Sequence, residues 1–167
     1  MKELIVLPIL SLMLVIQMAV VSRIPLFGLG YADLVLVTLA AWSLQERVET
    51  SWHWAVIAGL LVGWASALPW IVPVIGYLLM VAFARLLVRR IWQAPLLAMF
   101  VIVFFGSLIF HLLSALTLQL LGSPILIGDA LSVVTLPSLM LNLFLALPLY
   151  AIFRDLSVWV YDIEDYE

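Results

Sequence analysis

The sequence contains no cysteine, so it can form no disulfide, no thiolate metal site and no thiol nucleophile. Charge is also scarce, because Asp, Glu, Lys and Arg make up only 10% of the 167 residues, against about 25% in an ordinary soluble domain. No basic tract indicates nucleic-acid binding. These shortages exclude a soluble enzyme and a nucleic-acid-binding domain.

Enzyme motifs are missing as well. The chain has no HExxH, no GxSxG, no P-loop and no cluster of carboxylates with the spacing of metal ligands. Membrane enzymes that act on lipids or diphosphates need several polar groups held together at the interface. The charged residues here are too few and too scattered for that, so we expect no catalytic activity, no cofactor and no metal.

Apolar side chains, by contrast, make up 67% of the chain. A small soluble domain cannot hide such an excess, because much of its surface stays exposed to water. The apolar runs are long and unbroken, as in residues 96–113, whereas a membrane β-barrel has segments of about ten residues with alternating polarity. The sequence therefore predicts an all-α integral membrane protein.

We predict a single transmembrane domain, residues 1–167, built as a six-helix bundle. The spans are expected at about 4–22, 32–46, 52–68, 71–88, 94–121 and 133–154. The first is longer than the apolar part of a secretory signal and no small-residue cleavage site follows it, so we expect it to stay uncleaved. The fifth would reach about 42 Å as one helix. It must therefore tilt, break near Gly106 and Ser107, or continue beyond the membrane.

Basic residues segregate to one side of this predicted topology. That side collects Lys2, Arg47, Arg85, Arg89, Arg90 and Arg154. The other side has Arg23 alone. Since loops rich in Lys and Arg stay in the cytoplasm, both termini are expected to be cytoplasmic. Arg85, Arg89 and Arg90 are expected to fix this topology and could also contact anionic lipid headgroups.

Small residues share one face of the third span: Gly59, Gly63 and Ser66 follow one another at spacings of four and three. The stretch from Gly59 to Gly63 is a GxxxG motif, which lets two helix backbones approach closely in lipid. Packing inside the bundle is the favoured interpretation. The alternative is a docking face for the helix of a partner.

Two polar stripes follow the fifth and sixth spans at helical spacing. They consist of Ser107, His111 and Ser114, and of Thr135, Ser138 and Asn142. If the two helices are neighbours, the stripes should face each other and exchange hydrogen bonds worth about 0.6 kcal/mol each. The favoured interpretation is structural. The alternative is a ligand pocket or a proton-handling His111, because an ionisable side chain within a span is a functional candidate.

Asp33 stands at the start of the second span. A carboxylate costs little at the membrane interface, whereas at the bilayer centre it costs roughly 2.5–3.5 kcal/mol. Negative charge is also favourable in the first turn of a helix. We therefore expect Asp33 to be a structural cap near the interface.

Three segments carry a family resemblance: PLFGLGYADLVLVTLAAWSL (25–44), AGLLVGWASALPWIVPVIGYLLMVAFARLL (58–87) and LNLFLALPLYAIFRDLSVWV (141–160). They resemble the MreD family of rod-shape-determining membrane proteins, and together they cover about 40% of the chain. Many members carry an acidic residue in a GLLxD pattern, and this chain has Gly63 in its place.

The resemblance implies a non-catalytic scaffold subunit of the bacterial cell-elongation complex, in the cytoplasmic (inner) membrane. Such proteins bind the bitopic protein MreC and, through it, a RodA-type glycosyltransferase, a penicillin-binding protein and the MreB filament. The family is also similar in fold to the S-components of energy-coupling-factor transporters. The alternative is therefore a small-molecule-binding transporter subunit, whose polar stripes line a pocket open to the outer side.

Overall fold

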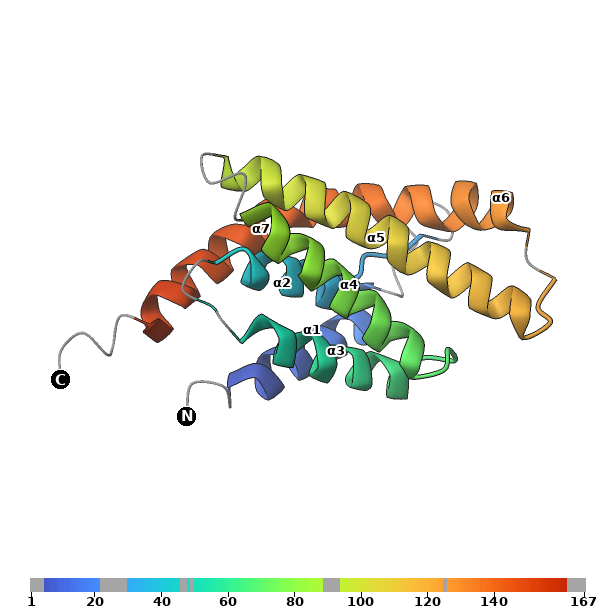
Figure 1. The fold of residues 1–167 in the computed structure, drawn as a ribbon, viewed down its shortest axis with the longest axis horizontal. Coiled ribbons are helices and arrows are strands. Elements are labelled where there is room, and N and C mark those ends of the chain that lie inside the picture. Colours follow the sequence, from blue (N-terminus) through green and yellow to red (C-terminus); the bar gives the residue numbers. More distant parts are fainter. Residues whose placement is uncertain are drawn as a thin grey trace.

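The computed structural model describes residues 5–21, 30–45, 48, 50–88, 94–124 and 126–161. Every regular element in these ranges is helical, which confirms the predicted all-α class for this part of the chain. The elements are α1 (Val6–Ala19), α2 (Leu34–Ser43), α3 (Ser51–Ala65), α4 (Ile71–Val88), α5 (Pro95–Leu120), α6 (Ile127–Asp129), the π-helical segment η3 (Ala130–Thr135) and α7 (Leu136–Tyr161) (Figure 1).

Three helical stretches are long and apolar enough to cross a membrane: α4, α5 and the run Ala130–Tyr161 that joins η3 to α7. The helices α1, α2 and α3 are apolar but shorter, with 14, 10 and 15 residues. The architecture is compatible with a membrane helical bundle. The largest departure from expectation is the second span: ten residues of α2 rise about 15 Å, half of a hydrocarbon core of about 30 Å.

Helix α5 is one continuous helix of 26 residues, with no break at Gly106 or Ser107. It begins at Pro95, whose missing N–H costs nothing at a helix start. It ends at Leu120, and Gly122, two residues further on, has a φ of 88°. Around this glycine the N–H of Ser123 reaches the carbonyl of Leu118 at 2.9 Å, a bond of the Schellman type that satisfies a terminal carbonyl.

Proline shapes the start of the last long helix. A proline ring clashes with the carbonyl four residues earlier in a regular helix, and Pro137 directly follows the wider π-helical turn of η3. There the hydroxyl of Thr135 donates to the carbonyl of Ala130 at 3.0 Å. Pro148 is accommodated inside α7. The helical run covers 130–161, so it begins earlier and ends later than the expected 133–154.

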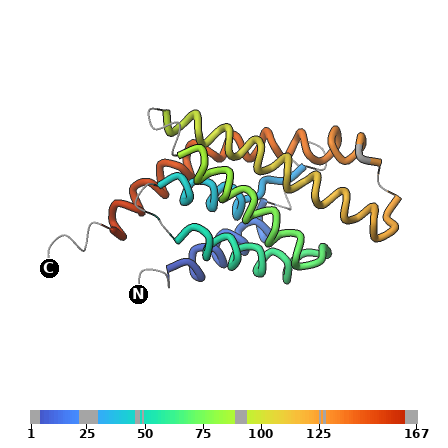
Figure 2. Tube along the Cα trace, viewed as in Figure 1, coloured from blue at the N-terminus to red at the C-terminus, as the bar shows by residue number. Residues whose placement is uncertain are grey.

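Helix α2 lies at the centre of the bundle. All ten of its residues are buried, and it contacts α1, α3, α4, α5 and α7. A helix that is apolar all round is typical of such an enclosed position. Figure 2 shows α5 and α7 side by side along one flank of α2, with α1 and α3 on the opposite flank.

The helices alternate in direction between two ends of the bundle. Figure 1 shows that α1, α3 and α5 begin, and α2, α4 and α7 end, at the same end, here called the terminal end. The opposite end, where α3 turns into α4 and α5 ends, is called the loop end. At the terminal end Trp42 stacks on Trp54, with ring centroids 4.5 Å apart, and Phe153 packs edge-on against Trp42 at 6.2 Å.

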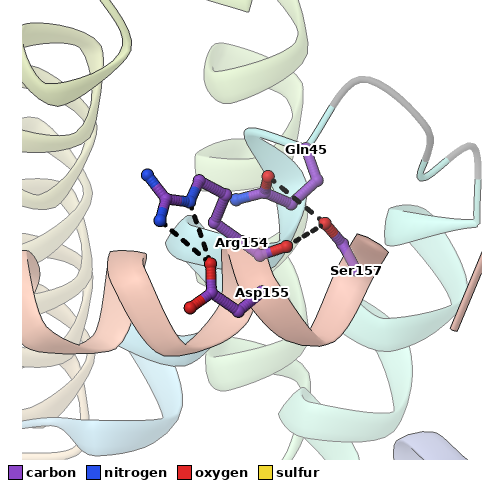
Figure 3. Close-up of polar contacts among 4 residues, drawn as sticks. All are labelled: Gln45, Arg154, Asp155 and Ser157. Carbon is purple, nitrogen blue, oxygen red and sulfur yellow. Dashed lines mark hydrogen bonds and ion pairs between the residues drawn. The ribbon is translucent and has the colours of Figure 1, made fainter. Parts of the chain in front are cut away.

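Polar contacts join α2 to α7 at the terminal end (Figure 3). The Ser157 hydroxyl donates to the carbonyl of Arg154 at 2.7 Å and lies 3.5 Å from Oε1 of Gln45. Arg154 pairs with the adjacent Asp155 at 3.0 Å, and both side chains are exposed. This ion pair is therefore expected to contribute little to stability.

Arg85 has a structural partner at the same end. Its Nη1 donates to the backbone carbonyl of Val48 at 2.7 Å, which ties α4 to the connection between α2 and α3. The other basic residues used for the predicted topology, apart from Arg154, lie outside the described residues: Lys2, Arg23, Arg47, Arg89 and Arg90.

Candidate functional site

The small-residue face of α3 packs against α4 of the same chain. A Cβ added to Gly59 would run into the Cα of Val74, and one added to Gly63 would lie 2.7 Å from the Cα of Trp70. The close helix approach indicated by the GxxxG motif is therefore made inside the bundle, and α4 fills this face. Ser66 follows the last residue of α3 in an extended conformation and lines the cavity described below.

The two polar stripes meet where the spacing predicts, between α5 and α7. Nδ2 of Asn142 donates to Oγ of Ser107 at 2.9 Å. The same two helices also reach the segment that precedes α2. Oδ1 of Asn142 accepts from the backbone N–H of Asp33 at 2.7 Å, and Oγ of Ser138 accepts from the backbone N–H of Tyr31 at 3.0 Å. Ser107, Ser138 and Asn142 are fully buried.

Asp33 caps α2, as expected. Its Oδ1 accepts from the N–H of Leu36 at 2.9 Å, and its Oδ2 accepts from the hydroxyl of Tyr77 at 3.2 Å. Another first-turn N–H, that of Val35, donates to Oε1 of Gln17 at 3.2 Å. Asp33 is only 4% exposed and is enclosed by the bundle; its position near the membrane interface stays a prediction.

These contacts form one unit, here called the anchor: Gln17, Asp33, Tyr77, Ser107, Ser138 and Asn142. The first four N–H groups of a helix lack partners within it, and non-helical backbone at membrane depth is tolerated only where protein buries it. The anchor meets both needs. It lets the backbone run extended up to Asp33 and lets α2 begin inside the bundle, which is why the second span is short.

A cavity of about 770 Å³ lies beside the anchor at the loop end. Its walls come from α1, Tyr31 and Asp33, the end of α3, the second half of α5 and η3. This volume is within the roughly 300–1,000 Å³ that small-molecule sites occupy. Most of the lining is apolar, and the polar side chains that reach it are Gln17, Tyr31, Asp33, Ser66, His111, Ser114, Asp129 and Thr135.

The residues of the two polar stripes thus have two different positions in the structure. Ser107, Ser138 and Asn142 belong to the anchor, whereas His111, Ser114 and Thr135 line the cavity. The hydroxyls of Ser114 and Thr135 donate to carbonyls of their own helices, at 2.8 and 3.0 Å. Their oxygens remain as acceptors toward the cavity.

His111 is half-buried at the cavity wall. Its ring lies 6.5 Å from the ring of Tyr31 and 6.3 Å from that of Phe110, measured between centroids. None of the described residues hydrogen-bonds to its imidazole. The side chain is therefore free to offer a ring nitrogen to a molecule in the cavity.

The charges at the cavity have one sign. Asp33 and Asp129 are acidic, and none of the described residues that line the cavity is a Lys or Arg. No cationic side chain of the described part of the chain pairs with either carboxylate. In the same part, no three His, Asp or Glu side chains converge as metal ligands.

Three polar residues of the anchor and the cavity were not predicted from the sequence: Gln17, Tyr31 and Tyr77. Gln17 and Tyr77 are isolated polar side chains in apolar helices, a signal that marks functional or packing positions within a membrane span. Their common partner, the start of α2, could not be found in this way. It depends on which helices become neighbours.

Comparisons with known proteins add no relative: no family model matches the sequence, no curated protein matches it, and no solved structure matches its fold.

Proposed function

We propose that this protein is a non-catalytic scaffold subunit of the bacterial cell-elongation complex, and that it binds an MreC-like bitopic partner through the outward face of α7. The observation that carries the proposal is the uncovered state of that helix. Over its most apolar 18 residues, 33% of the α7 run is buried, against 44% for α4 and 39% for α5. Of the three long helices, α7 therefore leaves the largest share of an apolar surface for a partner.

The side chains on this face stand clear of the bundle. Phe144 is 79% exposed and Met140 is 67% exposed, one helical turn apart. Large side chains that project in this way can pack into the grooves of a second helix, and in lipid such packing is the main drive for association. The three segments that resemble the MreD family support the same function, because they include α2, the second half of α3 with nearly all of α4, and most of α7.

In this proposal the chain is a multi-pass protein of the inner membrane, with the terminal end and both termini in the cytoplasm. Arg85 at the terminal end supports this orientation, since basic residues stay on the cytoplasmic side. The partner's own contacts then link the bundle to the RodA-type glycosyltransferase, the penicillin-binding protein and the MreB filament. The bundle holds and positions these partners and carries out no chemical step.

The test is co-purification of the full chain with a tagged MreC-like partner from one membrane preparation. Replacing Met140 and Phe144 together by Ala should lower recovery of the partner about tenfold, since interface hot spots each cost more than roughly 1 kcal/mol. The matched control replaces Leu60 and Leu79 by Ala. These half-exposed residues lie on the outward faces of α3 and α4, and the control should leave recovery unchanged.

Equal recovery with both double variants, at normal levels of inserted protein, would remove the α7 face as the docking surface. Recovery of ATP-hydrolysing subunits in place of a bitopic partner would contradict the scaffold function itself. That outcome would support a second function, a small-molecule-binding subunit of a membrane transporter. The observation that favours this second function is the cavity at the loop end, which combines apolar walls with a few convergent polar groups.

A further inference from the structure

The lining of the loop-end cavity restricts the charge of any molecule that enters it. Two acidic residues line the cavity, Asp33 just before α2 and Asp129 just before η3, and none of the lining residues that the structure describes is a lysine or arginine. An anion would bring its charge next to these carboxylates, and the described lining has no cation to offset it. Like charges at short range in a partly apolar site repel strongly. The lining therefore disfavours fatty acids, phosphates and other anions.

The hydrogen-bonding groups of the cavity also favour a cationic ligand, because an ammonium group donates hydrogen bonds and accepts none. The donors of Ser114 and Thr135 are already used by carbonyls of their own helices, so their oxygens act as acceptors. Asp33 receives bonds from Leu36 and Tyr77, and a carboxylate has about four acceptor positions. Capacity therefore remains on Asp33. Asp33, Ser114 and Thr135 thus supply acceptors, which suit a ligand that donates, beside the amide and hydroxyl groups of Gln17, Tyr31 and Ser66.

Two aromatic side chains also line the cavity. They are those of Tyr31 and Phe110, and both of their rings lie close to the ring of His111. A cation over the face of an aromatic ring is attracted by the ring's electrons, most strongly where water is excluded. The rest of the wall is aliphatic and suits an apolar body.

We propose that the cavity binds an apolar organic cation, with an ammonium group against Asp33 and His111 and an apolar body along α1, α5 and η3. This inference rests on the second function proposed above, small-molecule binding, and does not depend on the scaffold function. A site of this kind recognises the ammonium group by charge and by acceptors, and it recognises the body by burial of apolar surface.

The test uses two probes with nearly the same body and opposite charge. Radiolabelled 4-phenylbutylammonium and 4-phenylbutyrate are dialysed to equilibrium against the full chain in phosphatidylcholine nanodiscs, which carry no net lipid charge. The ammonium probe should show saturable binding near one molecule per chain. The carboxylate probe should show only the non-saturable uptake of empty nanodiscs.

Asp33→Asn should weaken binding of the ammonium probe roughly tenfold or more, the loss expected for one charge-assisted bond. Asparagine is as good a helix N-cap as aspartate, so α2 should still form, which a thermal melt would check. Asp129→Asn gives an independent variant, because this exposed side chain takes no part in the anchor. It should weaken binding a few-fold. Asp155→Asn, at the terminal end, should have no effect.

The outcomes separate the inference from the function on which it rests. Saturable binding of 4-phenylbutyrate with equal or higher affinity would overturn the charge assignment and leave small-molecule binding intact. An unchanged affinity in both folded variants, Asp33→Asn and Asp129→Asn, would also overturn it. Absence of saturable binding of both probes to the folded protein would overturn the inference alone; the transporter-subunit function is tested separately, by recovery of ATP-hydrolysing subunits with the chain.

The ammonium group could belong to a free amine or to a lipid headgroup, and a third arm separates these sources. Phosphatidylethanolamine, which carries a primary ammonium, replaces part of the phosphatidylcholine in the nanodiscs. Competition with the probe would support the inference with a lipid as the natural occupant. Unchanged probe binding would support it with a free amine as the occupant.

Discussion

Asn142 makes two hydrogen bonds of the anchor through its side-chain amide. It accepts from the backbone N–H of Asp33 and donates to Ser107, so it joins α7 to both α2 and α5. Its position is fully buried. Replacing Asn142 by an apolar residue leaves the buried backbone N–H of Asp33 without a partner. An unpaired buried donor lowers the free energy of unfolding by about 1–3 kcal/mol. The anchor is therefore the part of the bundle most sensitive to single polar substitutions.

Asn142→Leu tests this sensitivity. The variant keeps a side chain of similar size but removes both hydrogen bonds, so the melting temperature in detergent should fall by several degrees, as a loss of about 1–3 kcal/mol requires. Thr38→Val is the matched control. The Thr38 hydroxyl is buried in α2 without a partner among the described residues, so its loss should leave the melting temperature unchanged or raise it. Equal effects of the two variants would contradict the role of the anchor.

At the scale of elements, the close contact between α3 and α4 depends on two glycines of α3, which have no side chain. Gly59 and Gly63 let the backbone of α4 come so close that a methyl group has no room. In a membrane, helix association depends on such close packing because lipid is as apolar as the bundle interior. The contact that the sequence left open to a partner helix thus belongs to the chain's own fold.

Gly59→Ala should reverse the usual effect of this substitution. In an unhindered helix, alanine is favoured over glycine by about 1 kcal/mol. Here the added methyl meets the Val74 backbone, so α3 and α4 must separate, at a cost of typically 1–3 kcal/mol. A lower melting temperature is expected. Gly128→Ala, where no atom lies within 4 Å of the added carbon, should not lower it. A stabilised Gly59→Ala protein would contradict the close approach.

At the scale of the whole molecule, the alternating helices place the anchor and cavity toward one end and the aromatic cluster of Trp42, Trp54 and Phe153 at the other. The proposed orientation puts the cavity on the outer side of the membrane. A ligand would then enter from outside, while the terminal end faces the cytoplasm.

The lack of native cysteine makes this orientation directly testable. Single cysteines are introduced as Ser123→Cys at the loop end and Asp155→Cys at the terminal end, and intact cells are treated with a membrane-impermeant maleimide. Ser123→Cys should be labelled in intact cells, and Asp155→Cys only after the membrane is opened. The reverse pattern would contradict the proposed topology and would place the cavity on the cytoplasmic side.

Local sequence features predicted a substantial part of this structure. The helical class follows from composition, and the bounds of α4 and α5 follow from Pro95, Gly122 and the apolar runs between their ends. The cap at Asp33 and the meeting of Ser107 with Asn142 follow from residue type and helical spacing. The cap and the helix bounds depend on residues close together in the chain, and the Ser107–Asn142 contact depends on the polar face of each helix and on α5 and α7, which are adjacent long helices in the sequence, being neighbours.

The tertiary structure alone decided that α2 is short and enclosed, that Asp33 is buried, and that His111 faces a cavity while Asn142 does not. Asp33 and Asn142 are 109 positions apart, so their bond depends on which helices become neighbours. In a soluble protein, polar and apolar faces would indicate those neighbours. Here lipid and bundle interior are equally apolar, so a helix that faces lipid and a helix at the centre carry nearly the same pattern. Only packing distinguishes them.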